Sequence, residues 1–306
     1  MHNKEIKKKI LFVGDTDSIN IEIILKSHKF IKNKINYIII CDKTELKLYI
    51  KRINSNLKIN EILDPIKFLN YDKNSLNVFD VKNKYNEKYR NLLNQIDLSN
   101  NLSNVTGYDL ITMPIDKSDF KKKMSFTGVT EYLGKINKTD TVMLMYGENF
   151  SVIPLTTHIN LKTVHKHLNK RKLKKQLNTI INLTKEKKYS LKFSLIKFLC
   201  YNPHCGENGT IGKEDLLIKK LIKNNHNKIL GPYPADSAFK EYKKNTLFLS
   251  TYHDQALIPF KILNKKGINF TLGLNYRRLS PAHGTAKDIK FKGKANNTSY
   301  VQCMIN

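Results

Sequence analysis

Three histidines stand where short apolar runs of the chain end: His158, His204 and His253. Apolar runs of this kind form buried β-strands, and ligands in open α/β sheets collect beyond the carboxyl ends of the strands. Three neutral imidazoles that meet there suit a catalytic metal, because three protein ligands leave positions open for water or substrate. The spacings of 46 and 49 residues carry no local signature. Unrelated polar residues near loops therefore stay an alternative interpretation.

The elements that must position these histidines alternate between strand and helix patterns. This alternation predicts an α/β architecture, and a hairpin of residues 142–146 and 150–156 around Gly147 makes the sheet mixed. Residues 213–225 predict a helix, and residues 165–188 predict one amphipathic, solvated helix. The Asn- and Lys-rich residues 54–104 favour loops and short helices along one edge of the sheet. The other predicted strands are residues 10–13, 37–41, 110–113, 196–201 and 246–250.

Composition limits the class of protein. The 306 residues carry a formal charge of +28, yet arginine occurs at only five positions while lysine is spread from end to end, so we expect no specific nucleic-acid partner. No apolar run is long enough for a secretory signal or a membrane span, which predicts a cytoplasmic protein without a membrane partner. The four cysteines form no CxxC pair, which argues against disulfides and thiolate zinc sites.

Several ordered motifs surround the three histidines. They are residues 109–117 (DLITMPIDK), 126–132 (FTGVTEY), 154–158 (PLTTH), 202–207 (NPHCGE), 231–236 (GPYPAD), 252–255 (YHDQ), 267–274 (GINFTLGL) and 283–286 (HGTA). Together these motifs resemble those of the 4-hydroxythreonine-4-phosphate dehydrogenase family. The resemblance implies a two-domain, mixed-sheet fold like that of isocitrate and isopropylmalate dehydrogenases. One domain is then formed by residues 1–125 and 272–306, and the other, which carries the dimer interface, by residues 126–271.

The resemblance also implies the cofactors and the assembly. In this family the matching His158, His204 and His253 bind a divalent metal such as zinc, magnesium or cobalt, with ligands from both subunits of a homodimer. The implied dinucleotide cofactor is NAD, with NADP as the alternative. The family does not bind it through a GxGxxG turn, and this chain has no such turn.

The implied reaction belongs to the biosynthesis of pyridoxine and pyridoxal phosphate. It is the NAD-dependent oxidation of 4-phosphohydroxy-L-threonine with decarboxylation to 3-amino-2-oxopropyl phosphate. Arginine is rare in this chain, so the arginine at position 278 suggests that its planar, two-pronged guanidinium is needed to bind an oxyanion. The alternative is that Arg278 forms a surface ion pair. We expect Asp236 and Asp254 to be catalytic residues that orient the histidines or move a proton, and Lys117 is a further catalytic candidate. The positions that match the substrate-binding residues are Thr130, Lys261, Asn269 and Arg278.

Four departures from the family pattern leave other functions open. Val129 stands where the family has histidine, Ala282 stands where it has aspartate, and the turn of residues 14–20 has lost its Gly-Pro character. From the resemblance we also expect part of the usual last helix to be missing. One alternative is a paralogue that acts on another phosphorylated hydroxy acid, such as 4-phosphothreonate or 4-phosphoerythronate. Another is an eroded, non-catalytic homologue that binds polyanions through its charge.

Overall fold

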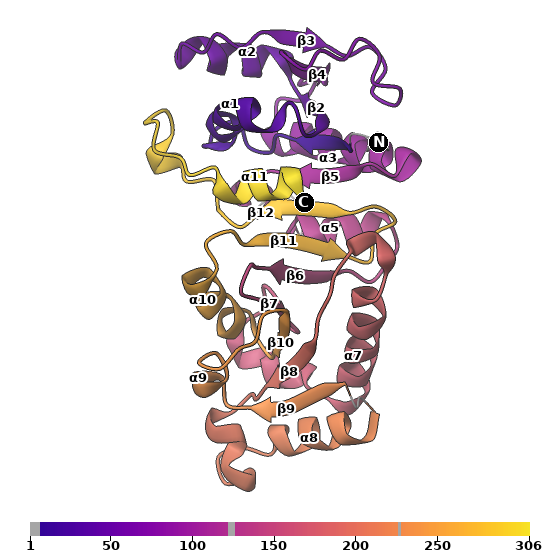
Figure 1. Cartoon of the computed structure of the whole chain (residues 1–306), viewed down its shortest axis with the longest axis vertical. Helices are drawn as coiled ribbons and strands as arrows, with labels where there is room; N and C mark the ends of the chain where they lie inside the picture. The colour runs from indigo at the N-terminus through magenta and orange to yellow at the C-terminus, as the bar shows by residue number, and fades with distance from the viewer. Residues whose placement is uncertain (1–6, 122–125, 226–227) are drawn as a thin grey trace, which may run out of the picture. The chain divides into compact units, whose positions relative to one another are not determined.

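The computed structural model describes residues 7–121, 126–225 and 228–306. These residues form two compact units: the first ends at residue 139 and resumes with residues 274–306, and the second lies between residues 140 and 273. Each unit is built on β-strands flanked by helices (Figure 1). The prediction of an α/β fold with a mixed sheet is confirmed.

The sheet of the first unit is parallel throughout, in the order β3-β4-β2-β1-β5-β12. The chain enters it at β1, passes through helix α1 to β2 on one side, and later returns through helix α3 to β5 on the other side of β1. The strand order therefore reverses between β1 and β5, which is where open α/β sheets bind ligands. The strands are β1 (Lys8–Phe12), β2 (Asn36–Cys41), β3 (Ile59–Glu61), β4 (Leu76–Asp80), β5 (Asp109–Thr112) and β12 (Arg278–Pro281).

Strands β1, β2 and β5 are hydrophobic on both faces because helices cover the sheet on both sides. Ile10, Phe12 and Leu110 are completely buried. Lys9 is also fully buried, and its ammonium lies 3.1 Å from the Asp109 carboxylate. The helices of this unit are α1 (Asn20–Ile31), α2 (Lys43–Arg52), α3 (Lys88–Thr106), α4 (Ser118–Lys121), α5 (Val129–Ile136) and α11 (Thr298–Ile305).

The second unit has its strands in the order β11-β6-β7-β10-β8-β9. Strand β6 runs antiparallel to both of its neighbours, whereas β7, β10, β8 and β9 are parallel. The strands are β6 (Val142–Tyr146), β7 (Phe150–Pro154), β8 (Leu195–Leu199), β9 (Ile229–Tyr233), β10 (Thr246–Ser250) and β11 (Ile268–Leu272). The helices are α6 (Val164–His167), α7 (Lys170–Thr184), α8 (Glu214–Asn225), α9 (Ala235–Ala238) and α10 (His253–Leu263).

Most predicted elements are confirmed within one or two residues, including the antiparallel hairpin of β6 and β7. The single helix predicted over residues 165–188 is wrong. The chain breaks at Leu168 and begins again as α7, because the Asn169 side chain caps the new helix by accepting a hydrogen bond from the Lys172 amide. The prediction for residues 54–104 is also wrong, since they contain two parallel strands and most of the 19-residue helix α3.

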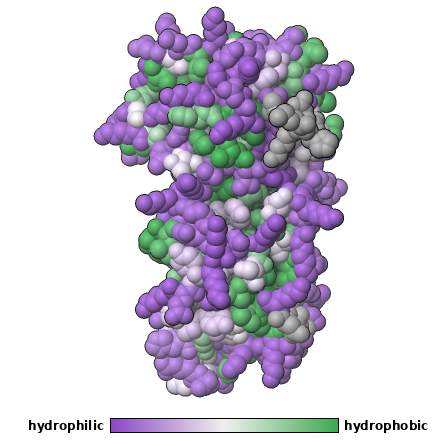
Figure 2. All heavy atoms as spheres, in the orientation of Figure 1, coloured by the Kyte–Doolittle hydropathy of each residue, from purple (hydrophilic) through white to green (hydrophobic). Residues whose placement is uncertain are grey.

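In the part of the chain that the structure describes, no helix has the length and apolar character needed to cross a membrane. Hydrophilic side chains cover most of the face shown in Figure 2, with smaller hydrophobic patches between them. This surface agrees with the even distribution of lysine along the sequence.

Candidate active site

The three histidines lie at the carboxyl ends of neighbouring parallel strands of the second unit. His158 follows β7, His253 is the first residue of α10 after β10, and His204 lies in a short 3-10 segment after β8. Strand β10 pairs in parallel with both β7 and β8. The three strands therefore deliver their histidines to the same edge of the sheet.

His158 and His253 lie next to each other. Their ring centroids are 5.7 Å apart, and both rings line a cavity of about 330 Å³. The other lining residues are Thr156, Thr157, Ile159, Leu161, Val164, Tyr252 and Asp254. His158 has a positive φ of 45°, an uncommon conformation for a residue other than glycine, and such strain is typical of functional sites.

His204 does not line this cavity. It lies in the segment Pro203–Gly209, in which residues 204–208 all have left-handed backbone angles. Its Nδ1 lies 3.1 Å from the Glu207 carboxylate. Among the described residues, no three His, Cys, Asp or Glu side chains form a group that could hold a metal ion. The metal site therefore stays a prediction.

Carboxylates accompany the histidines. The Asp254 carboxylate lies 2.7 Å from the Nδ1 of His253, an arrangement that orients an imidazole and leaves its Nε2 for a ligand. Asp236 is exposed in α9. Burial is the main cause that raises the pKa of the Cys205 thiol, next to His204, to about 12, and the charge of Asp236 contributes to this shift.

Two predicted substrate-binding residues meet in the first unit. Arg278, on β12, is only 3% exposed, which excludes the surface ion pair considered as an alternative. Its Nε donates a hydrogen bond of 2.9 Å to the Thr112 hydroxyl, and its Nη1 donates one of 3.1 Å to the Thr130 hydroxyl. Burial lowers the pKa of Arg278 to about 10, so the guanidinium keeps its charge at neutral pH. The sequence places these residues 148 positions apart, and only the fold brings them together.

The remaining predicted residues lie on different elements. Lys117 follows β5 in the first unit and is half-buried. Lys261 is exposed on α10, and Asn269 lies on β11, both in the second unit. The Asn269 Oδ1 atom is buried without a hydrogen-bond partner among the described residues. A buried acceptor without a donor is costly, so Asn269 suits contact with a bound molecule.

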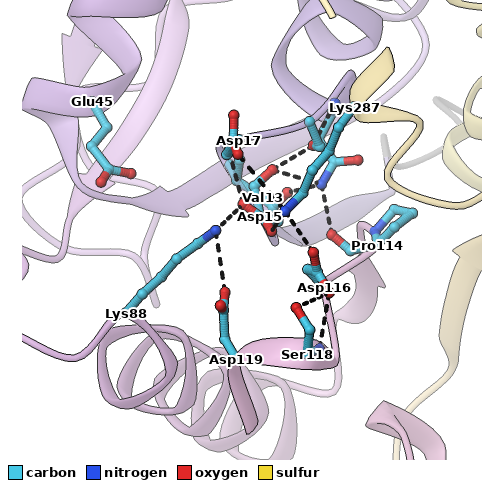
Figure 3. Close-up of polar contacts among 12 residues, drawn as sticks. Val13, Asp15, Asp17, Glu45, Lys88, Pro114, Asp116, Ser118, Asp119 and Lys287 are labelled. Carbon is cyan, nitrogen blue, oxygen red and sulfur yellow. Dashed lines mark hydrogen bonds and ion pairs between the residues drawn. The ribbon is translucent and has the colours of Figure 1, made fainter. Parts of the chain in front are cut away.

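A charged network at the switch point of the first unit was missed by the sequence analysis (Figure 3). Asp15, after β1, is completely buried and pairs with the ammonium of Lys88, 2.6 Å away at the start of α3. Lys88 also lies 3.4 Å from Asp119. Burial is the largest single influence on Lys88 and lowers its pKa, but the hydrogen bond to Asp15 and the charges of Asp15 and Asp119 together outweigh it, so the pKa is raised.

Lys287, after β12, extends the same network. Its ammonium lies 2.5 Å from the Asp116 carboxylate, 3.7 Å from Asp17 and 3.9 Å from Asp15. The hydrogen bond from Lys287 is the main cause that holds the pKa of Asp116 well below its usual range. Acidic residues directly after apolar runs, at positions 15 and 116, were the available sequence signal.

The departures from the family pattern have local structural roles. Val129 begins α5 and packs against the hydrophobic core of the first unit. The turn after β1 keeps Gly14, where a Cβ would lie 2.4 Å from the Pro114 carbonyl oxygen. The buried Asn20 amide donates to the carbonyls of Val13 and Pro114, which ties the ends of β1 and β5 together. The backbone amide of Ala282 donates to the Ser299 hydroxyl.

Residues 32–305 match the family model described as pyridoxal phosphate biosynthetic protein PdxA. The chain belongs to the PdxA family. It is similar to 4-hydroxythreonine-4-phosphate dehydrogenase of Aquifex aeolicus, with 36% identity covering 98% of this chain and 97% of the relative. The enzyme of the same name from a Hydrogenobaculum species is 43% identical, over 61% of this chain and 60% of the relative.

A solved structure agrees with these relatives. The crystal structure of 4-hydroxythreonine-4-phosphate dehydrogenase from Klebsiella pneumoniae superposes with a TM-score of 0.81 at 25% identity, covering 99% of this chain and 97% of that one. The family assignment and the resemblance in the sequence therefore agree. Relatives named as dehydrogenases make an oxidoreductase the functional class of the family.

Proposed function

We propose that this chain is an NAD-dependent, divalent-metal-dependent dehydrogenase that oxidises 4-phosphohydroxy-L-threonine and releases carbon dioxide to form 3-amino-2-oxopropyl phosphate. The observation that carries the proposal is the burial of Arg278 against the Thr130 hydroxyl, in a chain whose relatives with this name match it over almost its whole length. A buried guanidinium with hydroxyl neighbours suits a phosphate or carboxylate, because its planar fork can bind two oxygens at once.

Other residues of the chain are proposed to bind the rest of the substrate. They are Asn269, with its buried Oδ1, and the cations Lys261 and Lys117. We assign Lys117 and Asp236 to proton transfer, and Asp254 to the orientation of His253 through the 2.7 Å contact with its Nδ1.

We propose that His158, His204 and His253 bind the divalent metal, because neutral imidazoles are suitable ligands for such ions. Carboxylates lie beside the Nδ1 atoms of His204 and His253, which leaves the Nε2 atoms as ligands. The chemistry that zinc, magnesium or cobalt supplies at such a site is Lewis acidity, which lowers the pKa of the alcohol and stabilises the charge left by loss of carbon dioxide.

The dinucleotide, NAD or NADP, is proposed to bind at the carboxyl edge of the first unit. The strand order reverses there between β1 and β5, and such switch points hold nucleotides in open α/β sheets. Carboxylates such as Asp17 can accept hydrogen bonds from ribose hydroxyls, and the ammonium of Lys287 can pair with phosphate. The chemistry that the nicotinamide supplies is the acceptance of a hydride.

The active enzyme is proposed to be a homodimer. The cavity of His158 and His253 is lined by Ile159 and Leu161, which are 40% and 62% exposed. Ile258 and Ile262, on the helix that His253 begins, are 60% and 71% exposed. Apolar side chains around an incomplete ligand set favour coverage by a second copy that completes the site.

One observation favours a second candidate function. Val129 occupies the position next to Thr130 where the family pattern has histidine, so a polar group beside the substrate-binding hydroxyl is replaced by a hydrocarbon. A different phosphorylated hydroxy acid, such as 4-phosphothreonate or 4-phosphoerythronate, would suit a site without that group.

The decisive test incubates the purified protein with 4-phosphohydroxy-L-threonine, NAD and each of a series of divalent metals, and measures turnover as the increase in NADH absorbance. We expect NADH only with metal, and a loss of kcat/KM of about 100-fold in Arg278→Lys because a single ammonium cannot replace the two-pronged contact. Arg277→Lys is the matched control, since Arg277 pairs with Asp109 at 3.4 Å.

Three outcomes would change the assignment. Turnover of 4-phosphothreonate or 4-phosphoerythronate, without turnover of 4-phosphohydroxy-L-threonine, would establish the second candidate. Equal activity of Arg278→Lys and the wild type would remove Arg278 from the site. Tight DNA binding at physiological salt without any turnover would favour the polyanion-binding homologue.

A further inference from the structure

The segment that carries His204 has an unusual backbone. His204, Cys205, Glu207 and Asn208 all have φ between 44° and 59°, and Gly206 between them has φ of 75°. A left-handed conformation costs roughly 1–2 kcal/mol for each residue other than glycine. Surrounding contacts must therefore hold this turn in place.

The strongest of these contacts come from Asp215, in the first turn of α8. The side chain is buried, with the residue 2% exposed. One carboxylate oxygen accepts a hydrogen bond of 2.7 Å from the Tyr201 amide, and the other accepts bonds of 2.9 Å from the amide and from the side chain of Asn202. Hydrogen bonds to a charged acceptor are roughly twice as strong as neutral ones.

Further contacts join the turn to the residues around the start of α8. The Asn202 side chain also donates a 3.0 Å hydrogen bond to Glu214, next to Asp215. Gly206 packs so tightly that a Cβ there would lie 2.4 Å from the Gly212 carbonyl oxygen. The Ile211 amide donates to the Gly206 carbonyl at 3.2 Å. The backbone before His204 is thus attached to the first turn of α8, and the backbone after it to the residues that lead into α8.

We infer that Asp215 is a positioning residue for His204: by holding the amides of Tyr201 and Asn202, it keeps the left-handed turn in the form that presents the His204 imidazole to a divalent metal. The inference rests on the proposed metal site. The His204 side chain is 66% exposed, so packing does not fix it. Its Nδ1 lies 3.1 Å from Glu207, a residue of the same turn, so the backbone of the turn sets the directions open to the ring. Asp215 acts through the backbone and does not touch the metal.

The test compares two variants that make the same chemical change. In Asp215→Asn one carboxylate oxygen becomes an NH₂ group, which cannot accept from the Tyr201 or Asn202 amide and instead repels it. Asp42→Asn is the matched control, because Asp42 is also buried, 8% exposed, and accepts backbone hydrogen bonds from Thr44 and Asn83 in the first unit.

Zn²⁺ and Co²⁺ affinity of the full chain should fall by about 10- to 100-fold in Asp215→Asn, the usual effect of losing a group that orients a metal ligand. The absorption spectrum of the Co²⁺ form should change as well. Amide hydrogen exchange at Tyr201 and Asn202 should accelerate without metal. Asp42→Asn should leave the affinity, the spectrum and these exchange rates unchanged, although it loses similar stability.

The outcomes separate this inference from the proposed function. Wild-type affinity and an unchanged Co²⁺ spectrum in Asp215→Asn would overturn the positioning role. Wild-type protein that binds neither metal would overturn the metal site, while the exchange rates would still decide whether Asp215 holds the turn. If Asp215→Asn does not fold, Asn202→Ala removes only the side-chain bonds to Glu214 and Asp215, and we expect a smaller loss of affinity in the same direction.

Discussion

The carboxyl edges of the two units are organised in opposite ways. In the first unit, Asp15 is completely buried, and its charge is balanced by Lys88 and Lys287. In the second unit, His158 and His204 are exposed and lie on left-handed backbone. The first edge is held together by its own ion pairs, whereas the second edge exposes two of the three histidines that we propose as ligands of a divalent metal. Stability should therefore respond to different changes at the two edges.

The largest expected effect is stabilisation by metal at the histidine edge. A metal that binds only the folded protein, at 100 times its Kd, raises the free energy of unfolding by about 2.7 kcal/mol. Thermal unfolding with and without Zn²⁺, and after chelation, measures this. His253→Ala should abolish the shift, because it removes one of the two neighbouring imidazoles. An equal shift in this variant would show that the metal binds elsewhere.

At the charged edge, Asp15→Ala should lower the free energy of unfolding by about 2 kcal/mol in denaturant titration. Breaking a fully buried pair costs about 3–5 kcal/mol, and the 39% exposure of the Lys88 side chain reduces that figure. Asp119→Ala is the control, since Asp119 pairs with the same lysine from a partly exposed position and should cost at most about 1 kcal/mol. Equal losses of unfolding free energy in the two variants would show that the burial of Asp15 does not strengthen its ion pair with Lys88.

A smaller effect is expected from acid, and it also belongs to the first unit. Burial lowers the pKa of His28, whose Nδ1 lies 2.8 Å from the Tyr37 hydroxyl, and burial lowers the pKa of His283. As the pH falls, these two histidines therefore become protonated in the unfolded chain at a higher pH than in the folded chain. The stabilisation is present above a pH of about 6.5 and is lost as the pH falls below it.

Denaturant titrations between pH about 7 and pH about 5 measure this loss, in a range above the titration of ordinary carboxylates. His28→Gln cannot gain the proton and should show a weaker dependence, with the remainder due to His283. A pH dependence identical to that of the wild type would show that His28 is not responsible.

The smallest effect is expected from His158→Asn without metal. Asparagine tolerates the left-handed backbone of this position, and exposed substitutions usually change stability by no more than about 0.5 kcal/mol. The same variant should lose metal affinity. A large loss of stability without metal would show that the second edge is also held together by its own contacts.

Much of the fold could be predicted from local patterns. The apolar runs predicted β1, β2, β5 and β10, because buried parallel strands are hydrophobic on both faces. Local patterns failed where a single side chain decided the outcome, as where Asn169 caps a new helix inside a continuous amphipathic pattern. They also failed in residues 54–104, where a polar composition concealed β3, β4 and α3.

The sequence by itself determined the family, the three histidines at the ends of strands and the candidate substrate-binding residues, since each depends on residue types in a fixed order. Only the tertiary structure decided that Arg278 is buried against Thr130, that Asp15 meets Lys88 and Lys287, and that Asp215 holds the turn of His204. Burial and long-range pairing depend on how distant strands and helices pack, and the order of residues along a chain does not record which distant side chains come within hydrogen-bonding distance.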